Sequence, residues 1–261
     1  MLVPMLCVLL AGPIADVKPL PAAHAHNDYM HVRPLLDALE QGFCSVEADI
    51  FRVDDELLVA HEEATLKPER TLRALYLEPL RRRARENGGR IYRRGPTVTL
   101  LIDIKRDGEQ TYALLRRQLE EYRDILTSVE RGKLRRRAVT VILSGDCPRA
   151  TVAADEPRYA GIDGRVTDLG SRAPAHEMPL ISDNWGAIMR WRGSGPMPDE
   201  EKARLREIVA KAHGAGRRVR FWGAPGNEAF WTELLRAGVD LLNADDLPRL
   251  SRFLYDTRRP R

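Results

Sequence analysis

One stretch decides the fold of this chain: residues 43–61, with the sequence FCSVEADIFRVDDELLVAH. Residues 43–53 are rich in apolar and β-branched side chains, which is typical of a buried strand. The acidic triplet at 54–56 predicts a tight turn, and residues 57–60 predict a short strand that runs back antiparallel. The stretch therefore predicts a long strand with a hairpin attached to its end.

Two carboxylates, Glu47 and Asp49, share one face of the first strand because side chains alternate between faces. They lie roughly 7 Å apart along the backbone. Anions buried side by side repel each other and are poorly solvated, so this pair requires a cation. The hairpin returns His61 towards them. A metal-binding pair with a nearby histidine indicates metal-assisted hydrolysis.

Strand and helix patterns alternate along the rest of the chain. Eight parallel strands are predicted at 22–26, 43–53, 97–105, 138–144, 159–162, 180–182, 219–222 and 239–243, and helices at 34–41, 71–86, 110–129, 199–214 and 227–237. Alternation of this kind indicates an α/β protein with a parallel sheet covered by helices. Eight units favour a single (β/α)₈ TIM barrel with a short β-hairpin after its second strand. A doubly wound sheet is the alternative, but no G-x-G-x-x-G follows any strand.

Length and composition fit one soluble domain. A barrel of about 250 residues would use nearly all of the 261 residues, and we expect it to cover residues 21–261. The net charge of +4 reflects 36 Arg against 6 Lys. We attribute this skew to coding bias, so we expect no nucleic-acid partner.

Residues 1–20 read as a leader or signal-like segment. Residues 1–15 are apolar and too short to span a bilayer, as in the central region of a signal peptide. The usual basic residues before that region are missing, since the first is Lys18. We expect a secreted or periplasmic protein without a transmembrane segment, and a cytoplasmic location is the alternative.

Polar residues gather at the predicted strand ends, where TIM barrels place their active sites. The first strand ends at His26 and Asn27, the third at Asp103 and Lys105, and the seventh at Trp222. Each of these residues alone is more often a helix cap, a turn former or a surface ion-pair partner. Their combination with the hairpin favours a functional site.

The residue types point to metal-dependent acid–base chemistry. Glu47, Asp49 and Asp103 form an all-oxygen triad that suits one divalent cation, Mg²⁺ or Ca²⁺. Lys105 shares a strand face with Asp103 and suits an anionic substrate oxygen. His26 and His61 can flank the metal as acid and base, because imidazole titrates near neutrality.

The chain resembles the phospholipase C-like phosphodiesterases of the glycerophosphodiester phosphodiesterase superfamily, and within it the altered inheritance of mitochondria branch. The resemblance is dense up to about residue 105 and rests on residues 26–29, 33–39, 42–43, 45–49, 56–61, 68–72, 75–80 and 238–240. It implies a phosphoric diester hydrolase that cleaves a glycerophosphodiester or phospholipid-like substrate, with a role in lipid metabolism.

The resemblance also implies roles for individual residues. His26 and His61 would be the catalytic pair; Glu47, Asp49 and Asp103 would bind the metal; and Asn27, Lys105 and Trp222 would contact the substrate. This chain departs from the superfamily at three places. Where the superfamily has His-Arg-Gly, this chain has His26-Asn27-Asp28. The superfamily's glutamate on the third strand is replaced by Asp103, and its His-Asp is replaced by His61-Glu62.

Two other functions are open. A zinc amidohydrolase-like enzyme would use the H-x-H of His24 and His26, although the fifth and sixth strands supply no further histidine. A non-catalytic barrel would bind a phosphoester without turnover. The predicted partner is a small-molecule or lipid phosphodiester, and we expect no obligate protein partner.

Overall fold

The stretch at 43–61 folds as a hairpin in the computed structural model, which describes residues 17–257. β2 (Phe43–Val53) pairs antiparallel with β3 (Glu56–Val59), and the two-residue turn Asp54-Asp55 joins them. The register sets Ile50 opposite Val59 and Val53 opposite Glu56. Leu57 and Val59 are fully buried, so the apolar face of β3 pins this register.

Eight strands run parallel around a nearly closed barrel. They are β1 (Leu20–Ala25), β2, β4 (Val98–Ile104), β7 (Val139–Gly145), β8 (Ala160–Gly164), β9 (Leu180–Asn184), β10 (Arg218–Trp222) and β11 (Leu242–Ala244). Their order is β10-β9-β8-β7-β4-β2-β1-β11, and a parallel bridge between Arg220 and Leu241 joins the two ends. The predicted α/β fold, one (β/α)₈ barrel with a hairpin after the second strand, is confirmed.

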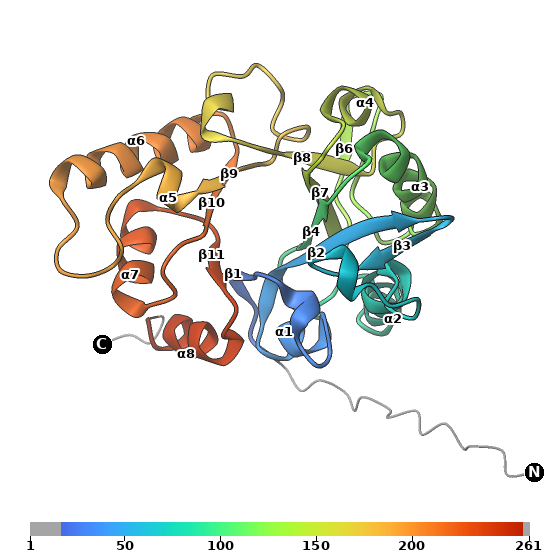
Figure 1. Cartoon of the computed structure of the whole chain (residues 1–261), viewed down its shortest axis with the longest axis horizontal. Coiled ribbons are helices and arrows are strands. Elements are labelled where there is room, and N and C mark those ends of the chain that lie inside the picture. The colour runs from blue at the N-terminus through green and yellow to red at the C-terminus, as the bar shows by residue number, and fades with distance from the viewer. Residues whose placement is uncertain (1–16, 258–261) are drawn as a thin grey trace, which may run out of the picture.

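Helices cover the outside of the strands, with α1 to α4 on one side and α5 to α8 on the other (Figure 1). The α-helices are α1 (Leu36–Glu40), α2 (Glu78–Glu86), α3 (Gly108–Glu121), α4 (Arg149–Ala154), α5 (Trp185–Ile188), α6 (Asp199–Gly214), α7 (Glu228–Ala237) and α8 (Leu247–Thr257). Shorter helical turns are η1 (Asp28–Met30), η2 (Glu63–Thr65), the π-helical η3 (Arg73–Leu77) and η4 (Val166–Asp168). The predicted helix at 199–214 matches α6 residue for residue.

The helix predicted at 110–129 is wrong in its second half. α3 ends at Glu121, and a separate hairpin follows, made of β5 (Ser128–Glu130) and β6 (Lys133–Arg135). Arg131 and Gly132 have φ of 49° and 72°, which a two-residue hairpin turn requires and a helix excludes. The hairpin is held by paired backbone hydrogen bonds between Val129 and Arg158, a long-range contact that helical periodicity does not reveal.

The barrel begins slightly before the predicted boundary at residue 21. Leu20 is the first residue of β1, is fully buried, and donates its backbone N–H to the Gly42 carbonyl at 2.7 Å. Most of the predicted leader, residues 1–16, lies outside the described residues. Within residues 17–257, no helix is both long enough and apolar enough to cross a membrane.

Side chains inside the barrel form layers. Leu101, Ile142, Leu180 and Leu241 form an apolar cluster separate from the main core. Because side chains alternate along a strand, Asp103 lies beyond Leu101 towards the carboxyl-terminal end of β4. Thr99 lies on the same face towards the other end. The apolar cluster therefore separates two polar ends of the barrel interior.

Candidate active site

The predicted site residues gather at the carboxyl-terminal ends of β1, β2 and β4, which we call the rim. The parallel register of β2 and β4 places Asp49 beside Asp103. Lys105 follows β4 directly, and its backbone N–H bonds the Ile50 carbonyl at 3.0 Å. His26 follows β1, and His61 comes two residues after β3.

His61 is held by Asp49. The β2–β3 ladder ends with the Ala60 N–H bonded to the Asp49 carbonyl, so the next residue reaches the Asp49 side chain. His61 Nδ1 lies 3.1 Å from Asp49 Oδ2 and 2.9 Å from the Tyr29 hydroxyl. The Tyr29 hydroxyl has one hydrogen, and two acceptors, Asn27 Oδ1 and Asp49 Oδ2, already lie within reach of it. That hydrogen is therefore not available to His61. Nδ1 is therefore the donor, and the neutral ring keeps Nε2 available as an acceptor.

His26 has a carboxylate partner of its own. Its Nδ1 lies 2.8 Å from Oδ1 of Asp245, which follows β11. Because an ionised carboxylate only accepts hydrogen bonds, Nδ1 carries the hydrogen here as well. The hydrogen bond from His26 holds the pKa of Asp245 below its usual value. Among residues 17–257, no hydrogen-bond partner occupies Nε2 of His26 or of His61.

Asn27 and Tyr29 connect the two histidines. Asp245 Oδ1, which accepts from His26 Nδ1, also accepts from Asn27 Nδ2 at 3.4 Å, and Asn27 Oδ1 accepts a 2.6 Å hydrogen bond from Tyr29. Asn27 has φ of 49°, a left-handed conformation that asparagine tolerates better than most residues. Tyr29 is buried and its ring is stacked with that of His61 at 6.3 Å between centroids. A continuous polar chain therefore runs from His26 to His61.

Lys105 pairs with two carboxylates at the rim. Its Nζ lies 2.6 Å from Asp49 Oδ2 and 3.3 Å from Asp103 Oδ1. Burial raises the pKa of both carboxyls above the ordinary value, and Lys105 partly offsets this effect. Burial alone would lower the pKa of Lys105, but the two aspartates raise it overall, so the ammonium group stays charged.

Glu47 is held by an arginine that the sequence analysis did not identify. Arg220 of β10 donates from Nη2 to Glu47 Oε2 at 3.0 Å and from Nε to Asn243 Oδ1 at 2.7 Å. Both members of the ion pair are buried. Burial would raise the pKa of Glu47, but Arg220 and His24 lower it well below the usual range. The cation that the sequence predicted for Glu47 is thus supplied by the chain itself.

His24 does not have the surroundings of a zinc ligand. It is fully buried, with Nδ1 at 2.7 Å from Ser45 Oγ and Nε2 at 3.3 Å from Glu47 Oε2. Burial, aided by Arg220, lowers the pKa of His24 to about 3. Both ring nitrogens are used inside the barrel, which argues against a zinc site built on the H-x-H of His24 and His26.

The carboxylate oxygens at the rim are the ligand type that a hard cation prefers, although their side chains do not converge on one point. Within residues 17–257, no three His, Cys, Asp or Glu side chains converge in a way that could hold a metal ion. Arg220 engages Glu47 instead, and Lys105 engages Asp49 and Asp103. However, Asp49 Oδ1 is buried and lacks a hydrogen-bond partner. An oxygen without a partner fits a hard cation, because Mg²⁺ and Ca²⁺ prefer oxygen ligands.

Trp222 is the remaining predicted site residue. Trp222 ends β10, and through β11 this strand lies two places from β1. The sequence analysis missed Tyr29 and Arg220 and left Asp245 without a role. The signal for Tyr29 was its place directly after His26-Asn27-Asp28, and the signal for Arg220 was a charged residue within a buried strand. Nothing local indicated which groups these side chains would bind.

Comparison with known proteins identifies the family. Residues 13–162, more than half of the chain, match the model of the AIM6-like phosphodiesterase domain. This chain belongs to that family. Residues 218–248, which include β10 and β11, match the model of the glycerophosphoryl diester phosphodiesterase family. The family assignment, which the sequence predicted mainly from residues 26–80, is confirmed.

Relatives extend the similarity over most of the chain. Altered inheritance of mitochondria protein 6 of Eremothecium gossypii is 33% identical over 91% of this chain and 70% of its own length. A homolog from Arthroderma benhamiae is 30% identical over 88% of this chain and 82% of its own length. The names of these relatives state no activity.

A solved structure confirms the fold at greater distance. The glycerophosphodiester phosphodiesterase from Parabacteroides distasonis aligns with a TM-score of 0.57 and 13% identity. The alignment covers 93% of this chain and 100% of that one. The barrel is therefore of the type found in that enzyme.

Proposed function

We propose that this chain is a metal-dependent phosphoric diester hydrolase that uses His26 and His61 as its acid–base pair. One observation carries the proposal: a hydrogen-bonded chain links the two imidazoles at the rim, and a carboxylate holds Nδ1 of each. A carboxylate on Nδ1 fixes the tautomer and directs Nε2 to the reacting group, as catalytic histidines require. Membership of a phosphodiesterase domain family supports the same reaction class.

The two histidines divide the proton transfers. One Nε2 accepts a proton from the attacking oxygen, which belongs to water or to a neighbouring hydroxyl of the substrate. The other imidazole, in its protonated form, gives a proton to the leaving alkoxide as the P–O bond breaks. Lys105 offers a positive charge to the phosphodiester oxygens. Asn27 and Trp222 would contact the substrate from β1 and β10.

A divalent ion would bind at Asp49 Oδ1, and Asp103 and Glu47 would become further ligands only if Lys105 and Arg220 released them. This division leaves Asp49 Oδ2 to Lys105, Tyr29 and His61. Arg220 and Lys105 leave the three carboxylates with one net negative charge, which favours a divalent ion together with an anionic substrate. When bound, Mg²⁺ or Ca²⁺ would polarise a phosphoryl oxygen.

The substrate class follows from the family. A glycerophosphodiester or a phospholipid-like diester, as a small molecule or as a lipid, is the proposed substrate. Asn27 stands where the superfamily has an arginine, so Lys105 is the cationic residue at the rim available for the phosphate. Export from the cytoplasm also remains a proposal, since it depends on residues 1–20.

A turnover assay tests the proposal. Bis(p-nitrophenyl) phosphate is offered to the purified protein with Mg²⁺, Ca²⁺ or Zn²⁺, and release of p-nitrophenol is followed. We expect turnover with Mg²⁺ or Ca²⁺ that chelation abolishes. Turnover with Zn²⁺ alone would instead support an amidohydrolase-like enzyme. Binding of the diester without turnover under any metal would identify a non-catalytic barrel.

A further inference from the structure

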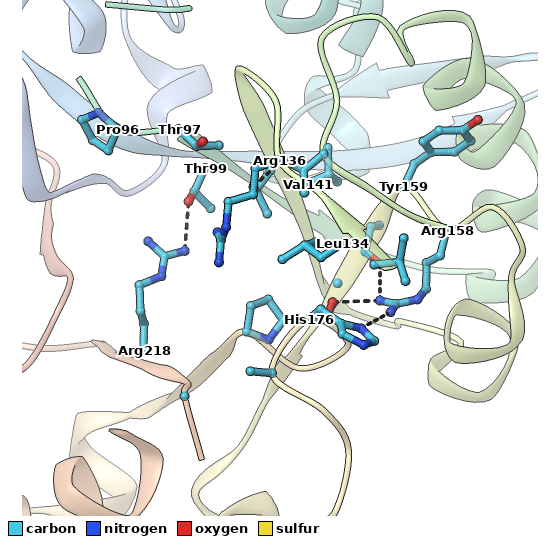
Figure 2. A pocket seen from close by; sticks show the side chains of 18 residues that line it. Pro96, Thr97, Thr99, Leu134, Arg136, Val141, Arg158, Tyr159, His176 and Arg218 are labelled. Carbon is cyan, nitrogen blue, oxygen red and sulfur yellow. Dashed lines mark hydrogen bonds between the residues drawn. The ribbon is translucent and has the colours of Figure 1, made fainter. Parts of the chain in front are cut away.

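A second pocket lies at the opposite end of the barrel from the rim. It has a volume of about 520 Å³ and opens among the amino-terminal ends of β4, β7, β8 and β10, beside the β5–β6 hairpin (Figure 2). Thr99 of this pocket and Asp103 of the rim lie four residues apart on β4, a separation of about 13 Å. The apolar cluster containing Leu101 and Ile142 fills the space between them.

The walls of this pocket are basic. Its 18 lining residues include Arg136, Arg158 and Arg218 and contain no Asp or Glu. A charge that is buried without a counter-ion is costly, and this cost applies to Arg158 and Arg218, whereas Arg136 is exposed. The composition of the walls therefore calls for an anion from outside the chain.

Arg158 does not need such an anion. Its Nη1 donates to the carbonyls of Ala160 and His176, and its Nη2 lies 2.8 Å from His176 Nδ1. Because the guanidinium can only donate, His176 Nδ1 is the acceptor. Arg158 thus ties β8 to the loop before β9 and serves as part of the wall.

Arg218 and Arg136, unlike Arg158, are available to bind an anion in the pocket. Arg218 points into the barrel, where Nη2 donates to Thr99 Oγ1 at 3.0 Å, and no carboxylate bonds its guanidinium among the described residues. Asp240 is the nearest acid, but its Oδ2 accepts from His213 and from the Val219 N–H. Figure 2 shows Arg136 directed into the same pocket. Burial lowers the pKa of Arg218, the charge of Asp240 partly offsets this effect, and the charge of Arg136 adds to it.

Hydroxyl groups and apolar side chains complete the walls. The Thr99 hydroxyl accepts from Arg218 and keeps its own hydrogen available, whereas the hydroxyls of Thr97 and Thr140 donate to the Arg137 carbonyl and to Thr127. Leu134 and Val141 supply apolar surface. Leu134, on the β5–β6 hairpin, is one of three large apolar side chains exposed among residues 17–257. A phosphate group offers three terminal oxygens and up to two charges to such donors, whereas a carboxylate offers two oxygens and one charge. A volume of about 520 Å³ also exceeds what phosphate alone would fill.

We propose that this pocket binds a small organic phosphate, with the phosphate between Arg136 and Arg218 and the organic part against Leu134 and Val141. It is a second ligand site, separate from the proposed phosphodiesterase site. Its occupant neutralises two arginines whose guanidinium groups form no ion pair with an acid among residues 17–257.

Calorimetric titration tests this site with two probes, inorganic phosphate and p-nitrophenyl phosphate. The protein variants are Arg218→Met and Arg136→Gln. Hydrogen bonds to charged groups contribute enough that each variant should weaken binding by about 10-fold or more. The organic probe should bind wild-type protein more tightly than phosphate does, because it also covers apolar surface.

Arg135→Gln is the matched control. Arg135 precedes Arg136, but it pairs with Glu130 and does not line the pocket, so this variant should bind both probes as the wild type does. Arg136 is exposed, so loss of binding in Arg136→Gln would not reflect unfolding. Wild-type affinity in both test variants, or affinity lost only in Lys105→Met, would place the anion at the rim and overturn the proposal. Failure of both probes to bind wild-type protein would overturn it as well.

Discussion

Tyr29 organises the rim at the scale of single residues. Its hydroxyl lies within hydrogen-bond distance of Asn27, Asp49 and His61, which come from three different segments. Burial and the nearby charge of Asp49 raise the pKa of Tyr29, so the hydroxyl keeps its hydrogen over the whole physiological range. Tyr29 therefore serves as a fixed polar link that keeps the imidazole of His61 in place.

The acid–base assignment predicts the effect of removing each imidazole. His26→Ala and His61→Ala should each lower kcat for bis(p-nitrophenyl) phosphate by about 10²-fold or more, as loss of general acid–base catalysis does. His213→Ala is the matched control, because His213 also pairs with an aspartate, Asp240 at 2.8 Å, but lies on α6. Steady-state kinetics give kcat for the three variants, and His213→Ala should match the wild type. Full activity in either rim variant would refute the assignment.

Asp28 should make stability depend on pH. It is fully buried, and burial raises its pKa from 3.8 to about 7, although the Leu35 N–H and the Tyr76 hydroxyl partly oppose this shift. The folded protein therefore binds this proton more tightly than the unfolded chain does. Between about pH 4 and pH 7 the folded state carries more protons, so the contribution of Asp28 to stability falls as the pH rises.

Asp28→Asn tests this linkage. The amide oxygen can keep both hydrogen bonds, while the charge is removed. At pH 8 the variant should be more stable than the wild type by about 2 to 4 kcal/mol, and this gain should shrink as the pH falls towards 4. Urea unfolding at a series of pH values measures the difference. A difference that stays constant across the series would contradict the raised pKa.

The β2–β3 hairpin is the element that joins the fold to the chemistry. Its sequence encodes both strands and the turn, and its register is pinned because Leu57 and Val59 are fully buried. A shift by one residue would turn the exposed Glu56 towards the buried face that Leu57 and Val59 now fill. Extra residues in the Asp54-Asp55 turn should therefore be absorbed by the loop, and the position of His61 should not change.

Two glycine insertions separate the effect of a longer turn from the effect of a displaced His61. One Gly between Asp54 and Asp55 should leave activity within a few-fold of wild type, since loop lengthening costs little. One Gly between Ala60 and His61 leaves the ladder intact but displaces the imidazole, and a shift of ~1 Å can cost about 10²-fold in rate. Thermal unfolding should be similar for both. If the turn insertion abolished activity and the second did not, the hairpin would not position His61.

The ion pair between Glu47 and Arg220 acts at the scale of the whole molecule. Residues 173 positions apart in the chain meet inside the barrel and join β2 to β10. Their side chains are only 10% and 3% exposed. A charge removed from this pair leaves its partner buried and uncompensated, which costs far more than the pair contributes as a unit.

A double-mutant cycle measures this coupling. Arg220→Met and Glu47→Gln should each lower the free energy of unfolding by about 3 to 5 kcal/mol. The double variant should lose much less than the sum, because no buried charge is left alone. Urea unfolding of the four proteins gives the coupling energy. Additive losses would show that the pair is not coupled.

The amino-acid sequence by itself determined the barrel and the location of its site. Strand and helix periods, the E-x-D pair and the hairpin are local patterns, since they reflect alternation of side chains and turn chemistry over a few residues. They predicted eight strands, and they predicted His26, His61, Glu47, Asp49 and Asp103 at one rim. Segments between residues 26 and 80, with residues 238–240, also carried enough similarity to predict the family.

Only the tertiary structure decided how the charges are paired. Barrel closure brings Arg220 to Glu47 and Asp245 to His26, over 173 and 219 residues, and no local period encodes such distances. The tertiary structure also decided the β5–β6 hairpin, whose backbone is hydrogen-bonded to Arg158, and the basic pocket beside this hairpin. Partner choice over these distances depends on strand order and register, which arise only when the whole sheet closes on itself.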